Sequence, residues 1–552
     1  MSQGTGTGNR PPMSALQGAG GRGKSLSILV RSGVLGGGLP HRTVKRLGAL
    51  AKYGPTLAGA FTAGRARAPK RVAVTDEQRS VTYDELYKRV QRIAAGLAEL
   101  GVGPDGPVAM YQRNSVYAVE TLVSASRAGA DALLLNTFLS PTQVTEVLHR
   151  ERPAVLIVDG ELRPNVVDVP DGTTVVIGAP EDGVGGEPTM DDLAESTQPD
   201  LPVPSRKGRL IVLTSGTTGA PKGAKRGAPK GLGPAASILS RIRFKAPETI
   251  VIAPPLFHTW GLAMLQLSPA LNATVVLRRR PDPETILAAV AENRATSLIV
   301  VPVMMQRMLD LPDEVRGKYD TSSLRVVASS SAPIPKDVCT RFQDTFGDVL
   351  FNLYGATEVS WATIATPEDL RTLPGTAGKP PYGTRLALLD ENNRPVPRGE
   401  IGRIFVGNEM QFEGYTNGND KERAHGLMST GDRGVLDENN LLTVLGRDDD
   451  MVIVGGENVY PIEVEELLIA QPEVKEVVVV GVTDDALQSR LAAYVVLHDG
   501  AHLSEEDVRG LVRGRLAKFS VPRDVVFLEA LPRNATGKVV PRLLPASTGA
   551  AQ

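Results

Sequence analysis

Short apolar segments that alternate with helix-like segments constrain the fold of this chain more than any other feature of its sequence. The runs 155–158 (VLIV), 210–213 (LIVL) and 298–301 (LIVV) have the length and composition of buried strands. Segments such as 283–292 (PETILAAVAE) lie between such runs and carry apolar residues at helical spacing. Buried strands separated by helices predict an α/β fold with doubly covered, largely parallel sheets.

The pattern of predicted helices and strands changes twice towards the C-terminus. From about Gly375 short strands and turns predict a more β-rich subdomain, and after Arg447 a small α/β unit follows. A chain of 552 residues is long enough for more than one domain. We therefore predict a disordered tail over 1–25, a basic segment over 26–71, a large domain over 72–447 and a small C-terminal domain over 448–552.

Charge is distributed unevenly along the chain. Twelve Lys and Arg residues and no acidic residue precede Asp76, so the remainder carries a net charge of −13. Basic residues mixed with Leu, Ile and Val over 26–71 suit a peripheral contact with an anionic membrane surface. They equally suit helices that pack on the main body with a basic face in water, and we favour this second interpretation.

The remaining bulk properties point to an ordinary reducing compartment. Cys339 is the single cysteine, which excludes an intramolecular disulfide, and no apolar run is long enough to span a bilayer. A charged start followed by an apolar signal core is also missing. We expect a cytoplasmic protein with no nucleic-acid partner, and peripheral association at the inner membrane surface is the alternative left open by the basic segment.

The stretch 213–223 (LTSGTTGAPKG) places hydroxyls and a lysine among glycines directly after an apolar run. Glycines let successive backbone N–H groups converge on an anion, and the hydroxyls and the lysine add donors and charge. This inventory suits a polyphosphate, although the Walker A pattern cannot be fitted to it. A flexible surface turn explains the stretch equally well when it is taken alone.

Three further motifs follow in order: 353–360 (LYGATEVS), 429–466 with its isolated Asp432 and Arg447, and 532–542 (PRNATGKVVPR). Together with 213–223 they resemble the adenylate-forming superfamily of acyl-CoA synthetases, adenylation domains and firefly-type luciferases. The resemblance runs from about residue 70 to about residue 543. It is greatest to actinobacterial-type fatty acyl-CoA synthetases, and includes the stretches 29–38 (LVRSGVLGGG) and 257–264 (FHTWGLAM).

The resemblance implies a two-step reaction with ATP and CoA as co-substrates and Mg²⁺ as the metal. A carboxylate attacks the α-phosphate of ATP to give an acyl-adenylate and pyrophosphate, and a thiol then displaces AMP. The implied catalytic residues are Lys538, Thr357, Glu358 and His258, and the implied metal-binding residues are Thr218 and Glu358. The implied ATP-binding positions are Thr214, Ser215, Gly216, Thr217, Thr218, Gly219, Lys222, Ser331, Ala332, Pro333, Asn352, Tyr354, Gly355, Asp432 and Arg447.

The same resemblance implies a mobile lid. Asp449 is the implied hinge, so that the C-terminal domain rotates and presents different groups to each half-reaction. After rotation the segment 455–461 (GGENVYP) replaces Lys538 beside the acyl-adenylate. The implied CoA-binding residues are Gly455, Gly456, Glu457 and Asn458.

The acid substrate is less constrained. Amino-acid-activating members place an aspartate near 254–261, and this chain has no acidic residue there, so we expect an acid without an α-amino group. The stretch 329–334 (SSSAPI) departs from the family's more glycine-rich pattern, which affects both adenine contacts and pocket depth. We expect an apolar pocket made by Phe257, His258, Trp260, Val303 and Met304.

The expected activity is that of a medium- or long-chain fatty acid–CoA ligase. The alternatives are an aryl-CoA ligase, a fatty acyl-AMP ligase that loads a carrier protein in trans, a luciferase-type oxygenase and a non-catalytic binder. Only 14 residues follow Lys538, so we expect any carrier to be a separate protein.

Overall fold

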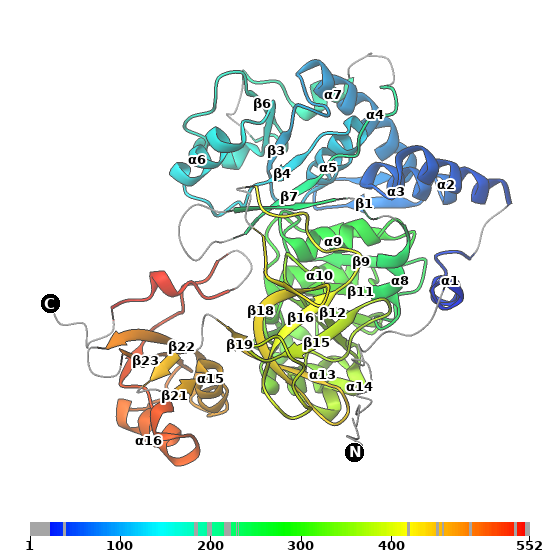
Figure 1. Ribbon diagram of the computed structural model, residues 1–552. Helices are drawn as coiled ribbons and strands as arrows, with labels where there is room; N and C mark the ends of the chain where they lie inside the picture. The colour runs from blue at the N-terminus through cyan, green and yellow to red at the C-terminus, as the bar shows by residue number, and fades with distance from the viewer. Residues whose placement is uncertain are drawn as a thin grey trace, which may run out of the picture.

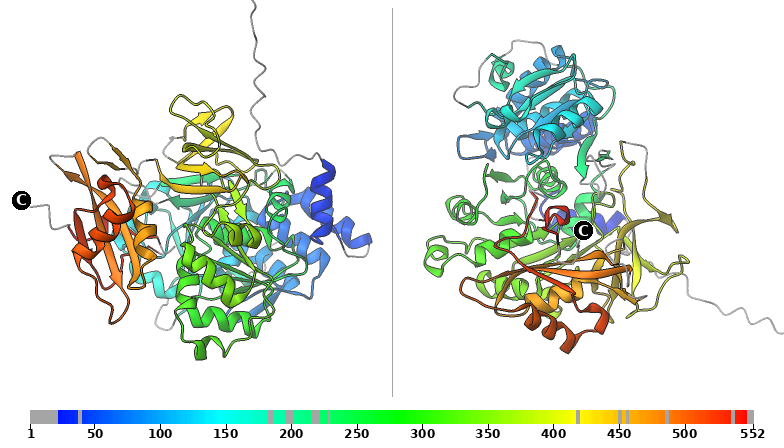
Figure 2. Two further views of the ribbon diagram at one scale, coloured as in Figure 1. Left: turned by 90° about the horizontal axis from the view of Figure 1, so that it is seen from below. Right: turned by 90° about the vertical axis from the view of Figure 1, so that its left-hand side faces the viewer.

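The computed structural model describes most of the chain in two connected parts (Figure 1). The described residues are 22–36, 40–181, 186–195, 201–214, 222–227, 229, 231–416, 420–448, 452–454, 457–484, 488–534 and 538–546. The described residues up to 448 form the large domain, and the described residues after it form a small domain beside it, orange to red in Figures 1 and 2.

An eight-stranded sheet forms one half of the large domain. Its strands are parallel except at the two edges, where β14 and β2 run antiparallel to their neighbours. The strand order is β14 (Thr363–Ala365), β13 (Leu350–Tyr354), β12 (Val326–Ser330), β11 (Ser297–Val300), β9 (Thr249–Ile252), β10 (Thr274–Leu277), β1 (Val72–Thr75) and β2 (Ser80–Thr82).

A six-stranded sheet forms the other half. It is parallel except for the final hairpin, in which β8 runs antiparallel to β7. The strand order is β6 (Thr174–Ile177), β5 (Val155–Val158), β3 (Val108–Tyr111), β4 (Ala132–Leu134), β7 (Leu210–Thr214) and β8 (Lys222–Arg226).

Helices cover both faces of both sheets. One continuous apolar cluster between the sheets contains side chains of the N-terminal and central helices, and separate clusters cover the two outer faces. The inner helices are α3 (Leu57–Arg67), α4 (Tyr83–Glu99), α5 (Val116–Ala128), α8 (Gly233–Leu239) and α9 (Thr259–Leu267). The short helix α7 (Met190–Glu195) packs on α4 and adds Met190 and Ala194 to the cluster between the sheets. The remaining helices are α6 (Pro141–Glu151), α10 (Pro283–Glu292), α11 (Pro302–Leu309), α12 (Asp313–Arg316), α13 (Lys336–Phe346) and α14 (Pro367–Thr372).

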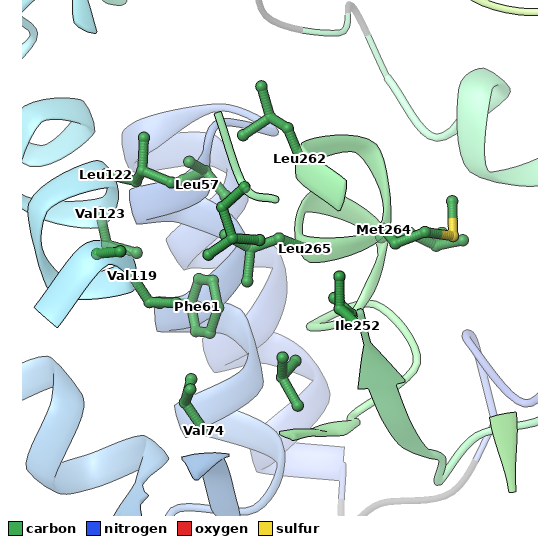
Figure 3. Packing of buried hydrophobic residues seen from close by; sticks show 14 of the residues in the cluster. Leu57, Phe61, Val74, Val119, Leu122, Val123, Ile252, Leu262, Met264 and Leu265 are labelled. Atoms are coloured by element: carbon green, nitrogen blue, oxygen red, sulfur yellow. The ribbon is translucent and has the colours of Figure 1, made fainter. Parts of the chain in front are cut away.

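Helix α3 shows how the two halves are joined. Its Leu57 and Phe61 point towards Val119 of α5 and towards Leu262 and Leu265 of α9 (Figure 3). Each fully buried aliphatic or aromatic side chain contributes about 1.5–3 kcal/mol, so this contact holds α9 of the eight-stranded half firmly against α5 of the six-stranded half.

The basic N-terminal segment packs on the large domain. Its first two helices are α1 (Arg22–Arg31) and α2 (Pro40–Tyr53). Ile28, Leu29 and Val34 are buried in the inter-sheet cluster, and α1 contacts α8.

A third, antiparallel sheet completes the large domain. It contains β15 (Arg385–Leu389), β16 (Gly402–Gly407), β18 (Leu427–Leu436), β17 (Arg423–Ala424) and β19 (Leu442–Arg447). The small domain has one further sheet, β21 (Glu457–Val459), β20 (Val452–Val454), β23 (Gln488–Leu497), β22 (Val474–Asp484) and β24 (Asp524–Phe527), with helices α15 (Pro461–Ile469) and α16 (Glu505–Arg515).

The predicted fold class is confirmed: a large domain of largely parallel, doubly covered sheets and a β-rich subdomain precede a small α/β domain. Among the described residues, no helix combines the length and the hydropathy that a bilayer crossing requires.

Candidate active site

One large cleft of about 1880 Å³ lies between the large and the small domain and continues into the large domain. Its walls come from α8 and α9, the end of β13 and the loop after it, β18 and β19, and the segment around Lys538. Most of the residues that the sequence motifs single out therefore meet in one cleft.

A chain of hydrogen bonds joins β13 to β18 on one side of the cleft. The Tyr354 hydroxyl donates to Oδ2 of Asp432 at 2.5 Å and lies 3.1 Å from the Thr430 hydroxyl. The strand register places Asp432 directly opposite Arg447. Burial raises the pKa of Asp432, whereas the Tyr354 hydroxyl and the charges of Arg447 and Lys538 lower it. The carboxylate is thus surrounded by donors and cations suited to a sugar or phosphate ligand.

A second carboxylate faces the same cleft. The Tyr415 hydroxyl donates to Oε1 of Glu358, and the backbone N–H of Phe412 donates to the Glu358 carbonyl at 2.8 Å. The neighbouring Thr357 hydroxyl lies 3.4 Å from the Thr259 hydroxyl at the start of α9. These contacts hold Glu358 and Thr357 at the junction between the third sheet and α9.

Lys538 reaches this junction from the small domain. Its backbone is held in a tight turn, because the Lys538 N–H donates to Oδ1 of Asn534 at 2.9 Å and the Asn534 N–H donates to the Lys538 carbonyl at 2.8 Å. The Lys538 charge lowers the pKa of both Asp432 and His258. Lys538 is therefore electrostatically coupled to both sides of the cleft.

His258 caps the first turn of α9. Its Nδ1 accepts a hydrogen bond from the Trp260 N–H at 3.5 Å. Burial, and secondly the Lys538 charge, lower the pKa of His258 to about 4. The imidazole is consequently neutral at physiological pH.

The glycine-rich loop is only partly described. Thr214 ends β7 and Lys222 begins β8, and the ladder pairs these two residues with each other. Ser215, Gly216, Thr217, Thr218 and Gly219 lie outside the described residues. The segment thus connects the strands of one hairpin at the edge of the six-stranded sheet.

The other predicted nucleotide positions surround the end of β12 and β13. Ser331, Ala332, Pro333, Asn352 and Gly355 all line the cleft. Asn352 is buried and donates to the Thr376 carbonyl at 3.1 Å. A Cβ on Gly355 would lie 2.3 Å from the Ser360 carbonyl oxygen, so only glycine fits this turn.

The predicted hinge and CoA positions are the least described. Asp449, Gly455 and Gly456 lie outside the described residues, and the backbone of Glu457 and Asn458 forms part of β21. In the strand order of the small domain, β21 is an edge strand separated from β22 and β24 by β20 and β23.

The structure brings only part of the predicted acid pocket into the cleft. His258 and Trp260 line the cleft, but Phe257, Val303 and Met304 are not among its lining residues. Phe257 is a buried core residue, and Val303 and Met304 pack against the inter-sheet core. The wall is instead made by α8 and α9, with Leu232, Ala235, Ile238, Leu262, Ala263 and Gln266.

Sequence reasoning missed Arg226, which ends β8 and lines the cleft. Its guanidinium donates to the Ser360 hydroxyl, which in turn donates to the Met410 carbonyl at 2.5 Å. Burial lowers the pKa of Arg226 to about 10 against the opposing effect of Glu358. Strand alternation was the available signal, because Ala224, two residues earlier on the same face, is fully buried.

These features define a class: a two-domain enzyme with a polar, nucleotide-sized half-cleft and a lysine supplied by the second domain. The sequence profile of the AMP-binding enzymes matches residues 61–416, and that of the AMP-binding enzyme C-terminal domain matches residues 463–538.

Curated relatives are also similar to this chain over most of its length. Feruloyl-CoA synthase of an Amycolatopsis species is 33% identical and aligns with 87% of this chain and 97% of its own length. Indoleacetate–CoA ligase of Aromatoleum aromaticum is 32% identical, with 85% and 94% covered. The ATP-bound crystal structure of MatB from Rhodopseudomonas palustris superposes with a TM-score of 0.79 at 30% identity, covering 88% of this chain and 98% of that one.

The chain belongs to the AMP-binding (adenylate-forming) enzyme family. It is an ATP-dependent, AMP-forming acid–thiol ligase that uses ATP and CoA as substrates together with Mg²⁺.

Proposed function

We propose that the chain converts an acid with an apolar, ring-bearing body to its CoA thioester. The observation that carries this proposal is the composition of the cleft wall formed by α8 and α9, which we call the acid half of the cleft. None of the described lining residues of α8 and α9 is acidic, and most are aliphatic or aromatic. Such a wall has no partner for an α-ammonium group and favours an apolar body. The feruloyl and indoleacetate relatives support an aryl acid over a fatty acid.

The nucleotide is assigned to the polar part of the cleft, which we call the nucleotide half. It contains Tyr354, Glu358, Asp432 and Arg447. Asp432, with Arg447 opposite it, is positioned to accept the ribose hydroxyls, and Tyr354 offers its ring beside adenine. Thr357 is assigned to the α-phosphate. Thr214 and Lys222, at the two ends of the hairpin loop, are assigned to the β- and γ-phosphates with Ser215, Thr217 and Thr218.

Mg²⁺ fits Glu358, because one carboxylate oxygen accepts the Tyr415 hydroxyl and the other remains for a hard cation. Thr218 is assigned as a second Mg²⁺ contact. Bound Mg²⁺ neutralises phosphate charge during adenylation.

Lys538 is assigned as the catalytic residue of the first half-reaction. Its ammonium, directed into the cleft, stabilises the negative charge shared by the substrate carboxylate and the α-phosphate as the new P–O bond forms and the bond to pyrophosphate breaks. Neutral His258 marks the boundary with the acid pocket and orients the carboxylate without competing for its charge.

The second half-reaction requires Lys538 to leave. We assign the pivot to Asp449 and the CoA-facing segment to Gly455, Gly456, Glu457 and Asn458. Rotation of the small domain exchanges Lys538 for this segment, and the CoA thiolate then attacks the acyl carbonyl as AMP leaves.

The test is a substrate panel for the purified protein. Pyrophosphate release and acyl-CoA formation are measured with hydroxycinnamates, indole acids, arylalkanoates, straight-chain acids and amino acids. We expect the highest kcat/KM with a ring-bearing acid and none with amino acids. Activity confined to amino acids would overturn the proposal.

A fatty acid is the second candidate, and the extension of the cleft along α9 towards α2 favours it. A straight-chain optimum in the same panel would decide for it. For the thiol, CoA is favoured by the relatives' names, and a phosphopantetheinylated carrier protein offered in trans tests the alternative acceptor.

We also propose a peripheral membrane contact through α1 and α2. Leu26 and Val30 of α1 and Val44 and Leu47 of α2 are each more than half exposed, at 55%, 54%, 70% and 62%. Basic residues of the same helices lie beside them, which suits an anionic surface.

The check is co-sedimentation with phosphatidylserine and with neutral vesicles at low and high salt. Val44→Gln should reduce pelleting, whereas Val167→Gln, at an equally exposed valine far along the chain (69%), should not. Equal pelleting of both variants, or no salt dependence, would contradict the contact.

A further inference from the structure

The cleft continues beyond the acid-activating centre. From His258 it follows Leu262, Ala263 and Gln266 of α9, with Ala235 and Ile238 of α8 facing them. It then reaches residues of the N-terminal segment. These are Val34, Leu35, Thr43, Arg46, Leu47 and Leu50.

The N-terminal part of this wall is fixed to the core. Arg67 of α3 donates to the carbonyls of Gly33 at 2.9 Å and Gly36 at 3.2 Å, and also to the carbonyl of Ala270 just beyond α9, at 3.4 Å. Arg46 donates to the Val34 carbonyl at 2.7 Å. The turn after α1, helix α2 and the end of α9 are therefore tied into one structure.

Helix α1 is anchored independently. The Ala246 N–H donates to the Ser32 carbonyl at 2.8 Å, and Ile28 and Leu29 are buried in the cluster that contains Ile238 and Leu239 of α8. The wall is thus preformed before any ligand binds, which reduces the entropic cost of binding.

The family profile begins at residue 61, so α1 and α2 lie before the part of the chain that defines the family. We propose that α2 and the turn after α1, with Val34 and Leu35, form the distal wall of the acid pocket and select acids by the length of their apolar body. This rests on the acid-activating function proposed above.

The length of α9 gives the scale of this selection. Its nine residues, Thr259–Leu267, correspond to about 13 Å at 1.5 Å per residue. A one-ring acid activated beside His258 stays within the first turns of α9. An arylalkanoic or aliphatic acid whose apolar body approaches the length of α9 reaches Thr43, Leu47 and Leu50 of α2.

The far end of the pocket is open. Leu47 lines the cleft and is 62% exposed, and Leu35 lines it at 40% exposure. The distal wall therefore stabilises long acids without imposing a sharp upper limit on their length.

The experiment compares full-length variants across an ω-phenylalkanoate series from phenylacetate to 10-phenyldecanoate, with KM and kcat from pyrophosphate release. Leu50→Trp narrows the distal end, and Leu47→Gln makes its rim polar. Leu26→Trp, on an exposed α1 residue that does not line the cleft, is the matched control. Thermal unfolding of each variant accompanies the kinetics.

We expect Leu50→Trp to raise KM about tenfold for the longest acids and to leave phenylacetate unchanged, with a smaller change of the same pattern for Leu47→Gln. Leu26→Trp should match the parent throughout. A uniform change for all lengths, or no change for any length, would overturn the distal-wall assignment. If Leu50→Trp does not fold, Leu47→Gln decides alone.

Failure of the proposed acid-activating function can be distinguished from failure of the distal-wall proposal. Absence of pyrophosphate release by the parent enzyme with every acid of the series and of the panel would refute the acid-activating proposal itself. A parent enzyme that is active but shows equal KM at all lengths would refute only the distal wall.

Discussion

The two halves of the cleft are built on different principles. In the nucleotide half, side chains are held by one another: Tyr354 by Asp432, and Glu358 by Tyr415. In the acid half, α8 and α9 present mostly aliphatic side chains whose only constraint is packing. Polar contacts fix positions to tenths of an ångström and tolerate few substitutions, whereas apolar walls of similar volume can be exchanged.

The difference teaches that the chemistry and the choice of acid are separable in this enzyme. A substitution in the nucleotide half should alter the reaction of every acid by the same factor. A substitution in the acid half should alter only some acids. The following predictions test this separation.

The largest effect is expected for Lys538→Ala. Losing a charge aimed at the developing negative oxygen should slow adenylation about 10²–10³-fold for every acid tested. Thioester formation from supplied acyl-adenylate should remain nearly unchanged. Both half-reactions are followed separately by pyrophosphate release and by acyl-CoA formation.

Lys518→Ala is the control, since Lys518 is an exposed lysine of the same domain that does not line the cleft. An equal loss in both half-reactions, or a loss that depends on the acid, would break the separation of roles.

Glu358→Gln should have the next largest effect. Removing the negative charge should raise the Mg²⁺ concentration for half-maximal adenylation about tenfold, the equivalent of one charge-assisted contact. A Mg²⁺ titration of pyrophosphate release measures it, with Glu438→Gln at an exposed turn as control. An unchanged titration would remove Glu358 from the metal site.

His258 lies where the two halves of the cleft meet, and its contribution to the stability of the folded protein should depend on pH. The folded protein holds the imidazole neutral with a pKa of about 4, below the usual 6.5, so the unfolded chain takes up a proton more readily between these values. This contribution to stability is complete above pH 6.5 and is lost as the pH falls towards 4, on the order of 3 kcal/mol in all.

His258→Asn keeps a capping oxygen and cannot titrate in this range. Chemical denaturation at pH 7, 5.5 and 4.5 should show the parent losing stability relative to the variant as the pH falls. A constant difference between the two proteins would show that His258 is not held neutral by the fold.

The smallest effect is expected at the contact between the domains. Nζ of Lys336 on α13 lies 2.7 Å from Oε2 of Glu466 on α15, and both side chains are partly exposed. Such a pair contributes about 0.2–1 kcal/mol. Lys336→Gln should therefore shift the ratio of the two half-reaction rates by less than about fivefold.

The shift should shrink at high salt, because exposed charges are screened. Lys318→Gln, at an exposed lysine elsewhere in the large domain, should leave the ratio unchanged. If the change in the rate ratio of Lys336→Gln differed between acids, the contact would influence the choice of acid and not only the chemistry.

The sequence singles out more residues of the nucleotide half than of the acid half. Tyr354, Glu358, Asp432 and Lys538 lie in short motifs that resemble those of the adenylate-forming superfamily, and the structure brings them into one cleft. Their mutual hydrogen bonds could not be foreseen, since Tyr354 and Asp432 are 78 positions apart.

The acid half could not be predicted in the same way. Apolar side chains such as Val303 and Met304 suit a pocket, but they suit a core equally well, and the structure packs both against the inter-sheet core. Ala235 and Ala263, which do line the cleft, carry no chemical signal at all. Only the packing of α8, α9 and α2 decides which apolar residues face the space.

Gly355 sets a limit for anyone who wishes to redesign this enzyme. The atoms that exclude a side chain there belong to the main chain, the Ser360 carbonyl oxygen at 2.3 Å and the Trp361 Cα at 2.7 Å, and no neighbouring substitution can remove them. A library aimed at new acids can therefore randomise the partly exposed cleft-lining positions of α8, α9 and α2, but every clone that changes residue 355 is expected to be lost.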